Sequence, residues 1–85
     1  MQDLSQAGIR LRKDQLWHHA RLAGVTNDRE MAEHLRLSAT TIWRLFRDDI
    51  GPGERVIAAT LVAFPELGFP DLFEVVADVR ELSAA

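Results

Sequence analysis

Residues 38–47, SATTIWRLFR, form the stretch around which the rest of the chain is arranged. Ser38 suits the N-cap of a helix, because its hydroxyl can accept an unpaired amide proton of the first turn. Leu37 lies just before this cap and Ile42 lies four residues after it, which is the spacing of a hydrophobic staple. Both signals predict a helix that starts at residue 39.

The two sides of this predicted helix differ in chemistry. At about 100° per residue, three apolar side chains share one arc. They are Ile42, Leu45 and Phe46. The opposite arc carries one short polar side chain and two guanidinium groups, on Thr40, Arg44 and Arg47. The pattern predicts a helix that buries one side and turns the other toward a negatively charged partner, although this helix alone leaves an ordinary solvated face as an alternative.

The composition is that of one globular domain. The chain has 85 residues, of which 47% are apolar and 27% are charged. We expect a loose N-terminus at residues 1–8 and a single domain over residues 9–85.

The absence of cysteine excludes disulfides, thiolate metal sites and thiol nucleophiles. No apolar run is long enough to span a bilayer and residues 1–8 lack the pattern of a leader, so we expect a cytoplasmic protein.

Charge is distributed unevenly along the chain. The net charge is −3, but residues 10–47 hold eight basic and four acidic side chains, whereas residues 48–85 hold two basic and eight acidic ones. Screening confines the influence of a charge to about 8 Å at physiological salt. A local basic face could therefore bind phosphate in spite of the acidic total.

Four more helices are predicted besides the one that starts at residue 39, which is the third in chain order. Their expected ranges are 13–23, 28–35, 54–64 and 71–82. Gly24 and Pro65 are the stop signals that follow the first and the fourth helix. Residues 9–12 alternate apolar and basic side chains, which suits either a short strand or the lead-in to a helix. The expected fold is all-α, a compact five-helix bundle with or without a short N-terminal strand.

The second and third helices are joined by a tight turn. Asn27 can cap the second helix, and Glu30 can reach back to the amide of Asn27 in a capping box. Only Arg36 and Leu37 remain between this helix and Ser38. Two short capped helices joined in this way are typical of a helix-turn-helix.

The C-terminal half supplies further apolar surface. The helix at 54–64 should bury Ile57, Leu61 and Phe64, with Val56 and Val62 widening the stripe. Trp17, in the first helix, is also expected in the core. The helix at 71–82 has more apolar surface than one packing face requires. It either closes the core or forms a dimer interface, whose expected residues are Leu72, Phe73, Val76 and Val79.

Residues 28–46, DREMAEHLRLSATTIWRLF, resemble the Cro and phage-repressor type of helix-turn-helix protein, the XRE family. The small residue that this family places in the middle of the second helix matches Ala32, and Met31 and Leu35 match the apolar positions around it. Ile42 and Leu45 match the inward positions of the third helix. Residues 51–76, GPGERVIAATLVAFPELGFPDLFEVV, resemble the C-terminal half of actinobacterial and mycobacteriophage members.

The resemblance implies a sequence-specific, double-stranded DNA-binding transcriptional regulator, a repressor or a Cro-like protein. It would act in a bacterium or a phage-infected host as a dimer without a small-molecule cofactor, and would read the major groove with residues 39–48. The implied base contacts are Ala39, Thr40, Trp43 and Arg44. The implied phosphate contacts are Asn27, Arg29, Arg36, Ser38, Thr41 and Arg47.

Two positions depart from the family pattern. Arg36 stands where glycine is common, so either the turn is shaped differently or the arginine is retained for a phosphate contact. Asp28 stands where some members bind phosphate and would repel it. Trp43 lies between the two faces of its helix and suits either boundary packing or a groove contact.

A second functional class stays open, a protein-binding module such as an antitoxin, with DNA binding secondary. Its partner would dock on Phe73 and on the acidic residues Glu74, Asp78 and Glu81. An enzyme is not expected, because no nucleophile with a base, paired carboxylates or phosphate-binding glycine loop is recognisable. The three histidines, His18, His19 and His34, do not have the spacing of a metal site.

Overall fold

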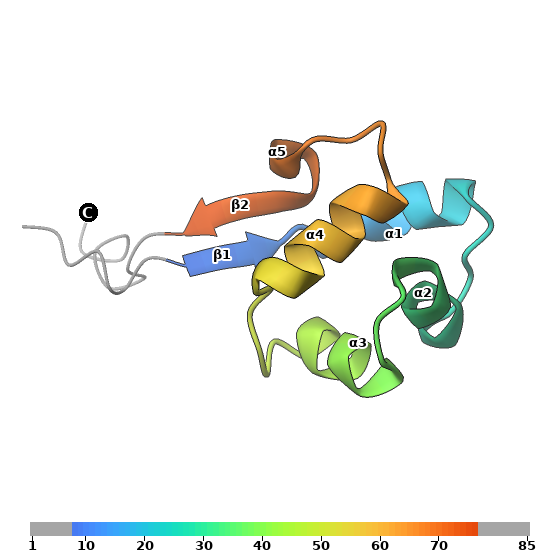
Figure 1. The fold of residues 1–85 in the computed structure, drawn as a ribbon, viewed down its shortest axis with the longest axis horizontal. Helices are drawn as coiled ribbons and strands as arrows, with labels where there is room; N and C mark the ends of the chain where they lie inside the picture. The colour runs from blue at the N-terminus through green and yellow to red at the C-terminus, as the bar shows by residue number, and fades with distance from the viewer. Residues whose placement is uncertain (1–7, 77–85) are drawn as a thin grey trace, which may run out of the picture.

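The computed structural model describes residues 8–76 as five helices and a short two-stranded sheet (Figure 1). The helices are α1 (Lys13–Leu22), α2 (Asp28–Leu35), α3 (Ala39–Phe46), α4 (Glu54–Ala63) and α5 (Phe69–Leu72). The strands are β1 (Gly8–Leu11) and β2 (Phe73–Val76). The prediction of a mostly helical fold with five helices is confirmed for this part of the chain. The prediction that it is purely all-α is wrong.

The two strands pair antiparallel and join the two ends of the described chain. Leu11 lies opposite Phe73, and Arg10 lies opposite Glu74, whose carboxylate oxygen is 2.6 Å from the Arg10 guanidinium. The backbone amide of Arg12 donates to the carbonyl of Leu72 at 2.8 Å and extends the connection by one residue. Of the two alternatives for residues 9–12, the strand is therefore the one that forms.

The predicted helix at 71–82 is wrong over its first half. Helix α5 ends at Leu72, and the next four residues, FEVV, form β2. Aromatic and β-branched side chains favour a strand, and the cross-strand pair of Arg10 and Glu74 adds to the pairing. Residues 77–82 of this prediction lie outside the described residues.

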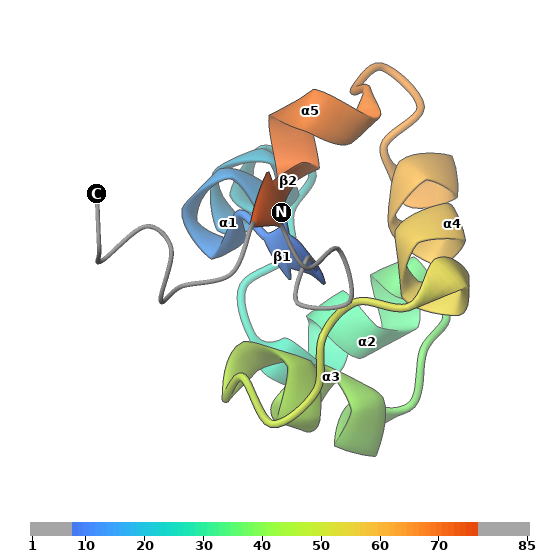
Figure 2. The ribbon, with the colours of Figure 1, turned by 90° about the vertical axis from the view of Figure 1, so that its left-hand side faces the viewer.

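The core lies between the sheet and the helices. Its largest buried side chains come from every helix, from β2 and from the residue after α4: Leu16, Met31, Leu35, Ile42, Thr60, Phe64, Leu72 and Phe73. In both Figure 1 and Figure 2, α3 lies at the end of the molecule opposite α5. Helix α3 therefore packs with one side only. None of the helices in residues 8–76 has the length and apolar character that crossing a bilayer requires.

Two core predictions need correction. Val62 is 79% exposed, whereas Val56 and Phe64 are buried as predicted and Thr60 is buried in addition. Ile57 and Leu61 are half-buried against this core. Thr60 can be buried because its hydroxyl donates to the Val56 carbonyl at 2.7 Å. Trp17 is also only half-buried, with its ring centroid 5.6 Å from that of Phe46 in α3.

Candidate functional site

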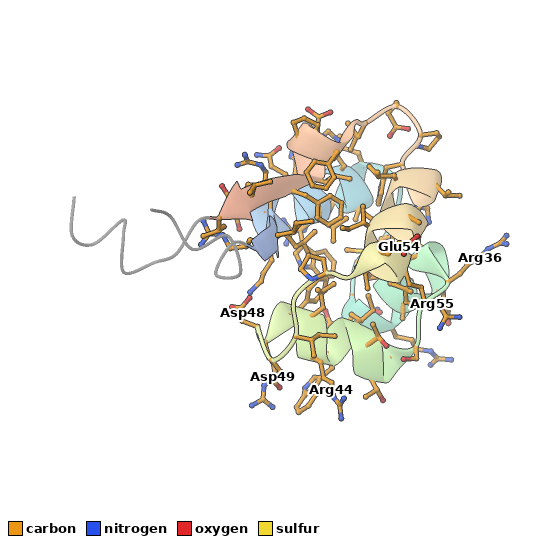
Figure 3. All side chains as sticks on the ribbon, turned by 60° about the vertical axis from the view of Figure 1, so that its left-hand side comes forward. Arg36, Arg44, Asp48, Asp49, Glu54 and Arg55 are labelled. Atoms are coloured by element: carbon orange, nitrogen blue, oxygen red, sulfur yellow. The ribbon has the colours of Figure 1, made fainter. Side chains whose placement is uncertain are left out.

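The outer face of α3 is the candidate site. Ile42 and Leu45 are buried, so the opposite side of the helix faces outward. Its exposed side chains are Ala39, Thr40, Trp43, Arg44 and Arg47. Arg44 extends away from the body of the protein (Figure 3) and forms no ion pair with any carboxylate in residues 8–76. The predicted division of α3 into an inner and an outer face is confirmed.

The first turn of α3 is closed by its own side chains. The Ser38 hydroxyl accepts from the Thr41 amide at 3.0 Å and donates to the Thr41 hydroxyl oxygen at 2.8 Å. The predicted N-cap is confirmed. Both hydroxyls were also predicted as phosphate contacts, but the Ser38 hydroxyl proton is already used. Thr41, which is half-buried, keeps a hydroxyl proton to donate.

The start of α2 is capped differently from the prediction. The Asn27 side chain accepts from the Glu30 amide at 2.8 Å, as expected. The Glu30 carboxylate does not return to Asn27 but accepts from the Thr26 hydroxyl at 2.5 Å and from the Thr26 amide at 2.7 Å. These hydrogen bonds, the one from the hydroxyl first, lower the pKa of Glu30. They tie the residue before Asn27 to the first turn of α2.

The turn between α2 and α3 contains a left-handed residue. Arg36 has φ 57° and ψ 40°, and the amide of Leu37 donates to the Ala32 carbonyl at 3.0 Å. With the bond from the Arg36 amide to the Glu33 carbonyl, this is a Schellman motif. Of the two alternatives for Arg36, a differently shaped turn is therefore wrong. The arginine occupies the conformation that glycine adopts most readily.

The same motif ends α3 and bounds its basic face. Asp48 has φ 63°, and the amide of Asp49 donates to the Arg44 carbonyl at 2.9 Å. The ammonium of Lys13, from α1, lies 2.8 Å from the Asp48 carboxylate and donates to the Phe46 carbonyl at 3.0 Å. The helix therefore ends at Phe46 and not at residue 48 as predicted.

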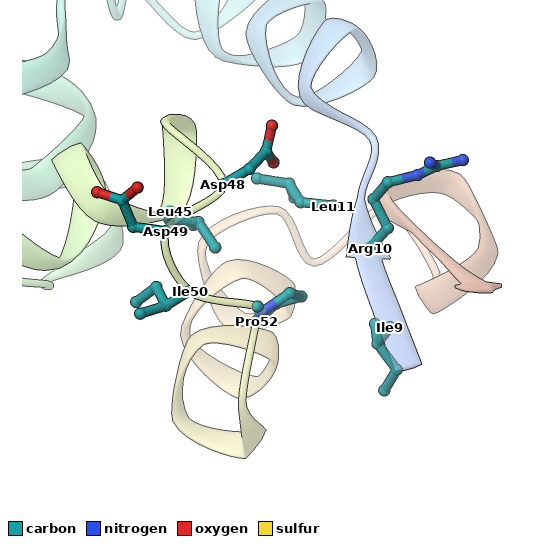
Figure 4. A pocket seen from close by; sticks show the side chains of 9 residues that line it. Ile9, Arg10, Leu11, Leu45, Asp48, Asp49, Ile50 and Pro52 are labelled. Atoms are coloured by element: carbon teal, nitrogen blue, oxygen red, sulfur yellow. The ribbon is translucent and has the colours of Figure 1, made fainter. Parts of the chain in front are cut away.

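Beyond this end of α3 lies a small hollow between β1 and the connection to α4 (Figure 4). Asp48 and Asp49 line it from the connection, and Ile9, Arg10 and Leu11 line it from β1. Two carboxylates at this end would repel phosphate. The part of α3 that suits a polyanion is therefore its outer face from residue 39 to residue 47.

Trp43 lies outside the core. Its side chain is 51% exposed, and the guanidinium of Arg47 stacks over the ring at 4.2 Å from the centroid. Arg47 also has a loose ion pair with Asp49, at 3.9 Å. The stack favours an arrangement in which both side chains lie together on the outer face.

Compared with known protein families, curated proteins and solved structures, the chain matches none.

Arg21 in α1 is an exposed basic residue near Asn27 and Arg29 that was not among the predicted phosphate contacts. Its guanidinium lies 5.7 Å from the centre of the Trp17 ring, and it lines a shallow depression together with Asn27 and Arg29. The signal in the sequence is the spacing of Trp17 and Arg21 by four residues on one helix. Helix α1 was expected only to support the other helices, so Arg21 was not predicted as a contact.

The remaining predicted phosphate contacts are exposed. Arg29 has only a loose ion pair with Glu33, at 3.5 Å, and Arg36 has none within residues 8–76. Figure 3 shows Arg36 and Arg44 pointing away from the protein in different directions. No three histidine, aspartate or glutamate side chains gather as a metal site in the described part of the chain.

Two of the four residues predicted for a dimer surface are buried within the domain. Leu72 and Phe73 are 0% and 1% exposed, because the switch from α5 to β2 turns both into the core. Val76 is half-buried in β2, and Val79 lies outside the described residues. The burial of Phe73 also removes the apolar contact expected for a protein-binding module. Glu74 is held by Arg10, whose hydrogen bond lowers the pKa of the carboxyl, while Asp78 and Glu81 are not described.

Proposed function

We propose that the protein is a sequence-specific, double-stranded DNA-binding transcriptional regulator, and that α3 enters the major groove. In this proposal α2, the turn at Arg36 and α3 act as a helix-turn-helix. The observation that carries the proposal is the outer face of α3, where Thr40, Trp43 and Arg44 are exposed together and Arg44 has no carboxylate partner in residues 8–76. The sequence resemblance to Cro and phage repressors supports the same function.

Base reading would rest on the middle of this face. A guanidinium can donate two hydrogen bonds to the O6 and N7 atoms of guanine, and such a pair contributes about 1–3 kcal/mol of discrimination. Arg44 is free to do this. Thr40 offers a hydroxyl and a methyl group one turn earlier, and Ala39 offers a methyl group only.

Backbone binding would rest on the residues around the face. Arg29, Arg36 and Arg21 are exposed cations on three different segments, and Asn27 adds a side-chain amide. Phosphate contacts position a protein without reading sequence. The carboxylates of Asp48 and Asp49 would keep the backbone away from the far end of α3.

We also propose that two copies bind together. One domain of this size covers too little DNA for high specificity, whereas a dimer reads two half-sites about 34 Å apart. The dimer surface would have to differ from the predicted one, since Leu72 and Phe73 are buried.

Fluorescence anisotropy with labelled duplexes tests the proposal. Affinity should fall steeply between about 50 and 200 mM salt, because basic side chains that bind phosphates release the counterions of the DNA. Arg44→Ala should reduce the difference between preferred and random duplexes, whereas Arg29→Ala should weaken both alike. Arg10→Ala is the matched control, because Arg10 is an exposed arginine of β1 paired with Glu74. No binding to any duplex over this salt range would refute the proposal.

A further inference from the structure

A shallow depression lies on the outer face of α3, beside the start of α2. Its lining residues are Asp28, Arg29, Ala39, Thr40 and Trp43. The α3 side contributes the methyl groups of Ala39 and Thr40 and the ring of Trp43. The α2 side contributes one carboxylate and one guanidinium. An apolar floor with charged groups at one edge is thus set into the face that also carries Arg44.

The Trp43 ring is held in place without being buried. Arg47 covers it at 4.2 Å from the ring centroid, yet the side chain remains 51% exposed. A tryptophan is enriched where one part of its surface is to be covered by a partner. Arg47 over the ring and the exposed Arg29 and Arg44 nearby favour an anionic partner over an apolar protein surface.

We propose that this depression receives the C5-methyl group of a thymine, so that Trp43 determines specificity. The inference rests on the proposed function. On the base edges of the major groove, the thymine methyl is the apolar group that distinguishes one base pair from another. An apolar depression on a face directed at duplex DNA therefore selects thymine over cytosine, which lacks the methyl.

Asp28 fits this arrangement, although it would repel phosphate. A carboxylate can accept a hydrogen bond from the N4 amino group of cytosine, which lies on the same edge of the bases. Arg29, its neighbour in the chain, can bind phosphate at the edge of the groove. The depression therefore brings a carboxylate, which could read a base, next to a guanidinium, which could bind the backbone.

Replacing each thymine of a preferred duplex by deoxyuridine removes only the methyl group and tests the inference. We expect one position in each half-site at which the wild-type protein loses affinity by about fourfold, the effect of leaving one methyl-sized group unburied. Trp43→Ala should weaken binding to the thymine duplex and abolish the difference between thymine and deoxyuridine at that position. Val62→Ala, at an apolar residue of α4 that is 79% exposed, should retain the difference.

The outcomes separate this inference from the proposed function. Duplex binding that is indifferent to every deoxyuridine, or a methyl effect of equal size in Trp43→Ala, would overturn the thymine site and leave DNA binding intact. A preferred site without a required thymine would do the same. Failure to bind any duplex would overturn both. Thermal unfolding of Trp43→Ala near the wild-type midpoint, as its exposure predicts, shows that the variant is folded.

Discussion

Replacing Arg36 by glycine should stabilise the protein and at the same time weaken its binding to duplex DNA. Arg36 is left-handed, with φ 57°, and ends α2 in a Schellman motif. This conformation costs an L-residue other than glycine about 1–2 kcal/mol, which the substitution by glycine removes. Part of the resulting gain in stability is lost because glycine is freer in the unfolded chain. Since Arg36 has no ion pair within residues 8–76, its removal costs no described electrostatic contact.

The net gain expected for Arg36→Gly is about 1 kcal/mol, which raises the melting temperature of a domain of this size by about 4–8 °C. Circular dichroism at about 222 nm, which reports helix content, follows the unfolding. Gly24→Ala is the matched control, because Gly24 occupies the same position at the end of α1, with φ 90° and no atom within 4 Å of an added Cβ. It should lower the melting temperature through the backbone conformation alone.

The binding measurement uses the same variant. Loss of a phosphate contact should weaken preferred and random duplexes by the same factor and reduce the slope of affinity against salt by about one ion. A variant that is no more stable than the wild type would refute the conformational argument. A more stable variant with unchanged affinity would show that Arg36 does not contact phosphate.

Four further substitutions test the packing and the electrostatics. Ala32→Leu should destabilise the protein by about 1–3 kcal/mol in urea unfolding, because Ala32 is buried in α2, which packs against α3; an unchanged midpoint would contradict that packing. Lys13→Met should cost about 1 kcal/mol, because the ammonium binds both Asp48 and the Phe46 carbonyl. Asp48→Asn should cost less, since an exposed ion pair contributes little and asparagine tolerates the left-handed backbone. Glu74→Gln should lower the melting temperature near neutral pH. The Arg10 hydrogen bond lowers the pKa of Glu74 in the folded state, so the stabilisation is present above its ordinary pKa of 4.5 and is lost as the pH falls below it. The difference from the wild type should therefore shrink on acidification, and a constant difference would contradict this assignment.

Local signals were sufficient to predict most of the helices. The caps at Asn27 and Ser38 mark where α2 and α3 begin, and the helical period separates the buried Ile42 and Leu45 from the exposed face. The prediction of the last helix was wrong over its first half for a reason that local sequence cannot reveal. The strand β2 exists because Glu74 and its neighbours pair with residues 64 positions earlier in the chain, around Arg10. Such pairing overrides the helical period of the apolar residues.

Helical spacing also made part of the candidate site predictable. Thr40, Trp43 and Arg44 follow from helical spacing, so their shared face was expected. The position of Arg21 beside Asn27 depends on how α1 lies against the loop before α2, and the neighbourhood of Asp28 and Trp43 depends on how α2 meets α3. These are tertiary arrangements, and the depression that they form has no signature in the sequence.

Selection of bound duplexes from a random library, carried out with the wild type and with Arg44→Ala side by side, tests whether α3 reads base sequence through Arg44. We expect the wild type to enrich two related half-sites about one helical turn apart, each with a required guanine. We expect Arg44→Ala to retain the spacing and lose the guanine. Base reading by Arg44 would be contradicted if the folded wild type enriched no site, or if both proteins enriched the same sequence.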